Sequence, residues 1–129
     1  MKYDEFVAKV QDRGKYDDRR QSERAMTDVL QLFGQRITAG EAEDLASQLP
    51  DPLGEVVLRS RSDTPESFGV TEFLRRLARQ EGASPESAEK DAKAVLSTLG
   101  QAVSGGELNQ VISQLPSGYA ALLGKPELT

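Results

Sequence analysis

Apolar residues recur along most of the chain at intervals of three and four positions, the spacing that gathers side chains on one face of an α-helix. Two long stripes dominate this pattern. They are formed by Ala25, Val29, Leu32 and Phe33 in the first half of the chain and by Ala88, Ala92, Val95, Leu96 and Leu99 in the second half. Shorter helical patterns precede each stripe, over residues 3–13 and around Phe73 and Leu77. The chain is therefore predicted to be all-α.

Residues that cap or break helices mark the ends of these segments. Gly14 and Gly82 are expected to end the first helix of each half. The next helix is predicted to begin near Asp17, a good N-cap residue. In the second half, Ser84 is the expected cap, with Pro85 at the first helical position, where its missing N–H costs nothing.

The third helix of each half begins with a capping-box pattern, a hydroxyl residue followed three positions later by glutamate. The two occurrences are Thr38-Ala39-Gly40-Glu41 and Ser104-Gly105-Gly106-Glu107. Pro50 and Pro116 are expected to stop these helices, because a proline moves the preceding residue out of the helical region. A short fourth helix is predicted after each proline, near residues 56–58 and 119–123.

Sliding the chain along itself by 66 residues superposes several short segments. Gly34-Gln35 meets Gly100-Gln101, Gly40-Glu41 meets Gly106-Glu107, and Ser47-Gln48-Leu49-Pro50 meets Ser113-Gln114-Leu115-Pro116. Glu5-Phe6 meets Glu72-Phe73 at an offset of 67, which places one inserted or deleted residue in a loop. The sequence therefore predicts two tandem pseudo-equivalent four-helix repeats packed into one helical bundle.

The repeat boundaries follow from the stretch that lacks periodicity. Residues 59–67 are polar, contain a proline and show no helical pattern, so they are predicted to be the linker. Repeat one is placed at 1–58 and repeat two at 68–129. Because each repeat has an apolar face that the other must cover, residues 1–129 are expected to form a single domain.

These features resemble the bacterial domain-of-unknown-function family of small two-repeat all-helical proteins. The features that carry the resemblance are the opening Lys2-Tyr3-Asp4-Glu5-Phe6, the Gly40-Glu41 and Gly106-Glu107 turns, and the paired Gln-Leu-Pro stops. The resemblance covers nearly the whole chain and implies a bacterial, all-helical protein. It implies no activity, and no catalytic residue is carried over from it.

Two missing residue types restrict the chemistry open to the chain. Its 129 residues include no cysteine and no histidine, which excludes disulfides, the usual zinc sites, and nucleophile systems based on thiolate or histidine. A carboxylate acid/base pair would need a cleft that raises one pKa, and short helices predict no such cleft. The protein is therefore predicted not to be an enzyme and to need no cofactor.

No apolar run approaches the roughly 20 residues that a transmembrane helix needs. The start of the chain is too acidic and polar for a signal peptide. We therefore expect a cytoplasmic protein with no membrane insertion. The net charge of −5 argues against broad, sequence-independent DNA binding, because proteins that neutralise phosphates carry an excess of Lys and Arg.

Carboxylates cluster at Glu41, Glu43 and Asp44, where a Mg²⁺ or Ca²⁺ site is conceivable. A simpler interpretation is favoured, because acidic side chains in a first turn complement the helix dipole and the capping box already accounts for Glu41. The second half has Asn109 and Gln110 at the positions of Glu43 and Asp44. No metal ligand is therefore assigned.

Arg75, Arg76 and Arg79 are the candidate partner-binding residues. They share one face of a helix, whereas the first half has Ala8, Lys9 and Asp12 at these positions at the offset of 67. The difference indicates either a docking surface for an acidic partner or drift after duplication. Arg19, Arg20 and Arg24 alternate with carboxylates and are expected to form a solvated, ion-paired face.

The function predicted from these observations is a non-catalytic protein-interaction or scaffolding module. Its partner would be another protein or a second copy of the chain. Two alternatives stay open: a nucleic-acid-associated regulator that uses the same arginines, and a small-ligand carrier with a pocket between the repeats.

Overall fold

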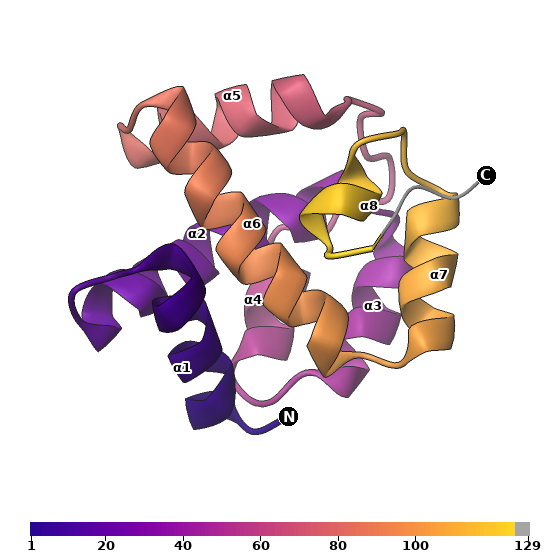
Figure 1. Ribbon diagram of the computed structural model, residues 1–129. Coiled ribbons are helices and arrows are strands. Elements are labelled where there is room, and N and C mark those ends of the chain that lie inside the picture. The colour runs from indigo at the N-terminus through magenta and orange to yellow at the C-terminus, as the bar shows by residue number, and fades with distance from the viewer. Residues whose placement is uncertain (126–129) are drawn as a thin grey trace.

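The computed structural model describes residues 1–125, which form eight helices and no strand (Figure 1). The helices are α1 (Tyr3–Gly14), α2 (Arg19–Arg36), α3 (Ala39–Gln48), α4 (Leu53–Arg59), α5 (Val70–Glu81), α6 (Pro85–Ala102), α7 (Gly105–Ser113) and α8 (Tyr119–Leu122). The prediction of an all-α fold is confirmed. Residues 126–129, the end of the predicted second repeat, lie outside the described residues.

The starts of the two long helices follow their capping residues. Ser84 accepts a hydrogen bond from the Ser87 N–H at 3.1 Å, and Pro85 occupies the first turn of α6, as predicted. At the start of α2 the N-cap is Asp18, one residue later than expected, and its carboxylate accepts from the Gln21 N–H at 2.9 Å. Both caps satisfy a backbone donor that would otherwise have no partner.

The ends of α1 and α5 differ in which residue takes the left-handed conformation. Gly82 does so after α5, with φ of 63°. After α1 this conformation belongs to Lys15, with φ of 54°, and not to Gly14. Gly14 is instead needed for space, because a Cβ atom there would overlap the ring of Tyr16.

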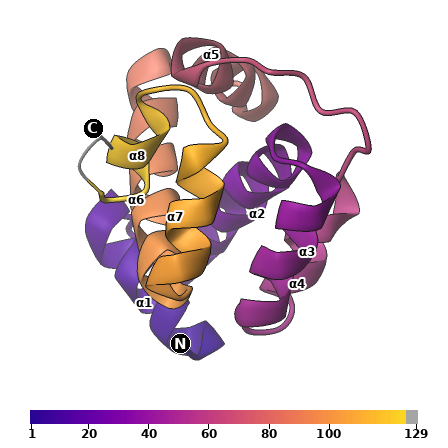
Figure 2. The ribbon, with the colours of Figure 1, turned by 90° about the vertical axis from the view of Figure 1, so that its right-hand side faces the viewer.

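The core is built around the two long helices, which pack on each other near the centre of the molecule (Figures 1 and 2). α1 packs on α2 and α6, and α5 packs on α6 and α2. α4 lies against α2 and α3, while α8 lies against α6 and α3 contacts α7. Helices from the two halves of the chain thus share one continuous apolar core.

Within this core, aromatic rings join three of the helices. The Phe73 ring on α5 meets the Phe33 ring of α2 edge-on at 6.4 Å between centroids, and it meets the Tyr119 ring of α8 edge-on at 5.8 Å. All three residues are fully buried. The remaining apolar side chains of the α5 stripe also point inward, which leaves the arginines of this helix on its other faces.

Candidate functional site

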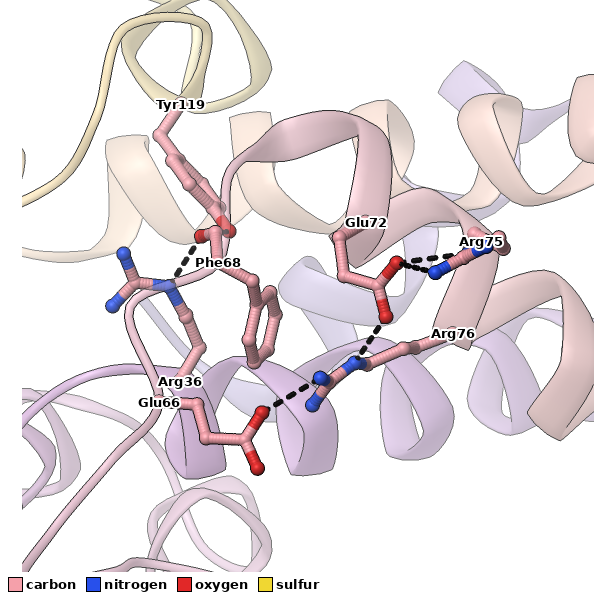
Figure 3. Close-up of polar contacts among 7 residues, drawn as sticks. All are labelled: Arg36, Glu66, Phe68, Glu72, Arg75, Arg76 and Tyr119. Atoms are coloured by element: carbon pink, nitrogen blue, oxygen red, sulfur yellow. Dashed lines mark hydrogen bonds and ion pairs between the residues drawn. The ribbon is translucent and has the colours of Figure 1, made fainter.

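The three arginines that sequence analysis singled out, Arg75, Arg76 and Arg79, lie on α5 and differ in their surroundings. Figure 3 shows Arg75 and Arg76. Arg75 and Arg79 are exposed, with 67% of the Arg75 side chain open to solvent. Arg76 retains only 31% exposure. Arg75 and Arg79 therefore point into solvent, whereas Arg76 packs against neighbouring residues.

Two carboxylates pair with these arginines. Glu72 accepts hydrogen bonds from Arg75 Nε at 2.8 Å and from Arg76 Nε at 2.7 Å, and Arg76 Nη2 also donates to Glu66 at 2.7 Å. Hydrogen bonds from Arg76 and Arg75 hold the pKa of Glu72 below its usual value. Within residues 1–125, Arg79 forms no ion pair.

Arg76 has a structural partner in Phe68, which lies in the segment between α4 and α5. The Arg76 guanidinium lies 4.1 Å from the centroid of the Phe68 ring, and the Arg36 guanidinium lies 5.3 Å from it. The Phe68 carbonyl accepts from Arg36 Nε at 2.7 Å and from the Tyr119 hydroxyl at 2.9 Å. These contacts fix the path of the linker onto α2, α5 and α8 (Figure 3).

Arg36 is a residue that sequence analysis did not single out. It is 5% exposed, which is unusual for arginine. The sequence feature that indicates its burial is its position on the apolar stripe of α2, three residues after Phe33. Its acceptor, the Phe68 carbonyl, lies 32 residues away in the chain, so the pattern of α2 alone could not identify the partner.

A cluster of carboxylates forms where α3 meets α7. One oxygen from each of Glu41, Asp44 and Glu107 lies within 4.8 Å of the others. Glu41 is 5% exposed and Glu107 is 9% exposed, whereas Asp44 is exposed. Glu43, which sequence analysis grouped with Glu41 and Asp44, is exposed and lies outside this cluster.

The capping-box interpretation of these glutamates is wrong for the second half. The Ser104 hydroxyl does accept from the Glu107 N–H at 3.2 Å, as Thr38 does from Glu41 at 3.2 Å. The Ser104 N–H, however, donates to Gln48 Oε1 at 2.7 Å, so it is not available to the Glu107 carboxylate. The side chain of Gln48, from the other half of the chain, has displaced the local contact.

The Glu41 carboxylate is likewise used across the α3–α7 contact. Its Oε1 accepts from the side-chain amides of Gln110 and Gln114, both at 3.1 Å. Buried oxygens Glu41 Oε2 and Glu107 Oε1 have no hydrogen-bond partner. Burial, followed by the charge of Glu41, raises the pKa of Glu107 to about 7. None of the ion pairs between residues of the described chain includes these carboxylates.

A second group of carboxylates lines a pocket of about 260 Å³ between α2 and the α5–α6 corner. Asp91 accepts a hydrogen bond from the Tyr16 hydroxyl, and Asp28 and Glu81 lie beside it. Burial is the main cause that raises the pKa of Glu81 to about 8, with Asp91 as the second cause. Sequence analysis predicted no cleft that raises a carboxylate pKa, and this pocket corrects that expectation.

Glu81 is expected to make the free energy of unfolding depend on pH near neutrality. Its pKa is about 8 in the folded protein and 4.5 without the fold, so between these values only the folded state binds the proton. The contribution of Glu81 to the free energy of unfolding is therefore fully present below pH 4.5 and is lost as pH rises through 8. After allowance for partial solvent exposure of the side chain, the loss is about 1–3 kcal/mol. Urea unfolding at pH 5.5, 7 and 8.5 measures this decline.

The variant Glu81→Gln keeps a hydrogen-bonding side chain without the titrating proton. Its unfolding free energy should decline less between pH 5.5 and 8.5 than that of the wild type. The matched control Glu86→Gln removes an exposed carboxylate from the next helix and should leave the wild-type slope unchanged. Equal slopes for Glu81→Gln and the wild type would contradict the assignment.

Comparison with known proteins places the chain in a family. A family model described as an uncharacterized conserved protein, DUF2267, matches residues 3–122. The chain belongs to this family. The DUF2267 match runs from the first residue of α1 to the last residue of α8, so every helix described above lies within the family region. A search of curated proteins finds no match.

No helix formed by residues 1–125 combines the length and apolar character needed to cross a membrane. The family description assigns no activity. The function of the chain must therefore be argued from its own surfaces.

Proposed function

We propose that this protein is a non-catalytic protein-interaction module that presents the outer face of α5 to an acidic partner. The observation that carries the proposal is the exposure of Arg75 and Arg79 on a helix whose opposite face is buried in the core. Although the chain carries a net charge of −5, these two guanidinium groups place positive charge on the outer face of α5, where it can attract an acidic segment.

A non-catalytic role is supported by the way the unusual carboxylates are held. Glu81 and Asp91 interact with each other, and the Tyr16 hydroxyl donates to Asp91. Burial and the neighbouring Asp91 therefore account for the raised pKa of Glu81, and no catalytic role is needed to explain it. The absence of cysteine and histidine from the sequence removes the common nucleophile systems as well.

A small-ligand carrier is the second candidate, and one observation favours it. The pocket beside Asp91 is lined by residues from both halves of the chain, including Asp28 from α2 and Lys90 from α6. Its lining carries both charge signs, which suits a small polar molecule. A nucleic-acid-associated regulator is disfavoured by the net negative charge.

The interaction proposal predicts the behaviour of the double variant Arg75→Glu/Arg79→Glu. Both side chains are exposed, so the fold should be retained, with stability changes of about 0.5 kcal/mol per site. Affinity for an acidic protein partner recovered from cells should fall at least about tenfold, and wild-type binding should weaken with added salt. Arg76 is left intact because it holds Phe68 and Glu66.

The matched control is Arg59→Glu/Arg61→Glu, which makes the same charge change at two exposed arginines outside α5. This control should bind the partner nearly as well as the wild type. An equal loss in both double variants would indicate general electrostatic attraction and overturn the assignment to α5. Unchanged binding by the α5 variant would overturn it as well.

We also propose that the chain is a duplication of one four-helix unit, with repeat one at 1–58, a linker at 59–67 and repeat two at 68–129. Helix bounds support this, since α2 and α6 differ by 66 residues at both ends and α1 and α5 differ by 67. The packing of α1 on α6 parallels that of α5 on α2. A bacterial, cytoplasmic setting stays a prediction.

A further inference from the structure

We propose that Glu41, Asp44 and Glu107 form a Ca²⁺-binding site that joins α3 to α7. The three side chains come from both halves of the chain and converge with one oxygen each within 4.8 Å. One ground for the sequence-based expectation of no metal was a capping role for Glu41. The carboxylate of Glu41 instead accepts from the amides of Gln110 on α7 and of Gln114, which directly follows α7, so this ground no longer holds.

The convergence of acidic groups alone would not indicate a ligand, but two buried oxygens do. Glu41 Oε2 and Glu107 Oε1 belong to residues that are 5% and 9% exposed, and neither oxygen has a hydrogen-bond partner. Carboxylate oxygens that have lost water without gaining a donor are normally satisfied by a proton or a cation. A proton shared by the two glutamates would satisfy these oxygens as well, whereas a cation would also use the Asp44 carboxylate, and the response to Ca²⁺ described below distinguishes the two.

The burial of two of the ligands favours Ca²⁺ over Mg²⁺. An ion held between Glu41 and Glu107, which are 5% and 9% exposed, must give up part of its water shell. Mg²⁺ loses water reluctantly and demands a near-ideal octahedron, whereas Ca²⁺ accepts carboxylates in flexible geometry.

Exposure of Asp44 provides the route for the ion. With three carboxylates from the protein, water must complete the coordination shell, and such partly hydrated sites bind Ca²⁺ weakly, with Kd of about 0.1–1 mM. Binding would link the first turns of α3 and α7, and therefore the two halves of the chain. It would stabilise their contact where Gln48 and Ser104 already connect them.

Thermal melts of the full chain with 0–10 mM Ca²⁺ test the site. The wild-type melting temperature should rise in a saturable way, by about 3–6 °C at tenfold excess over Kd, because the ion binds only the folded state. Mg²⁺ at the same concentrations should produce a smaller rise. Glu107→Gln and Asp44→Asn should each lose most of the Ca²⁺-induced rise, whatever their stability without the ion.

Glu43→Gln is the matched control, since it removes an exposed carboxylate of α3 that lies outside the cluster, and it should keep the full rise. As a second readout, Mn²⁺ should broaden the amide NMR signals of residues 41–44 and 105–108 first, and Ca²⁺ should reverse this. The proposal is overturned if Ca²⁺ leaves the wild-type melt unchanged to 10 mM. An equal rise in Glu107→Gln and Glu43→Gln, or broadening centred elsewhere, also overturns it.

Discussion

Neither half of the chain is expected to fold by itself when the protein is divided after Ser62. Fragment 1–62 would expose the surfaces of α1 and α2 that α6 covers, and fragment 63–129 would expose the face of α5 that packs on α2. Exposing one buried Leu or Phe side chain costs about 1.5–3 kcal/mol, and a domain of this size has a total stability of only about 5–15 kcal/mol. Losing several such contacts therefore removes the cooperative transition.

Circular dichroism melts of the separate fragments measure this outcome, and gradual, non-cooperative loss of helix is expected for both. Mixing the fragments should restore part of the wild-type signal, because the missing surfaces are complementary. The intact chain, expressed in parallel, serves as the control. Two monomeric fragments with sharp melting transitions would show that residues 1–129 are two domains and contradict the expectation of a single domain.

The helices themselves could be predicted because their signals are local. The Ser84 cap, the Pro85 first turn and the end of α5 at Gly82 depend on residues within one turn of the helix end. The apolar stripes were likewise sufficient to place the long helices, since a period of three to four residues survives in any tertiary environment. These features required no knowledge of the neighbouring helices.

The candidate carboxylate site could not be predicted, because the capping-box spacing is compatible with two orientations of the glutamate side chain. Glu107 follows Ser104 at capping-box spacing whether its carboxylate turns back to the Ser104 N–H or outward to another helix. The amide of Gln48, 56 residues earlier in the chain, decides between them by accepting from that N–H. Which helix lies opposite α7 is tertiary information that the spacing does not contain.

The contacts of the arginines on α5 could likewise be predicted only in part from the sequence. Sequence analysis correctly placed Arg75, Arg76 and Arg79 on one helix, and the structure pairs two of them, Arg75 and Arg76, with Glu72. The contact of Arg76 with Phe68 depends on the course of the linker. Since residues 59–67 have no periodicity, that course could not be derived from the sequence.

The glycines repeated at an offset of 66 have a physical reason that the structure supplies. Gly34 on α2 lies against the backbone of α4, and a Cβ atom added there would overlap the carbonyl oxygen of Val57. Gly100 on α6 has the same relation to the carbonyl oxygen of Leu123. A backbone carbonyl cannot rotate away as the end of a flexible side chain can, so either helix pair would have to separate.

Gly34→Ala is therefore expected to lower the free energy of unfolding by about 2–3 kcal/mol, measured by urea denaturation. The matched control is Gly40→Ala, where an added Cβ meets no atom within 4 Å; it should be neutral or stabilising by up to about 1 kcal/mol, since alanine is the better helix former. Both substitutions replace a helical glycine by alanine, so their difference reports mainly the contact between α2 and Val57. Equal stabilities for the two variants would mean that α4 moves away from α2 at little cost, and that the close approach of these helices does not explain the repeated glycine.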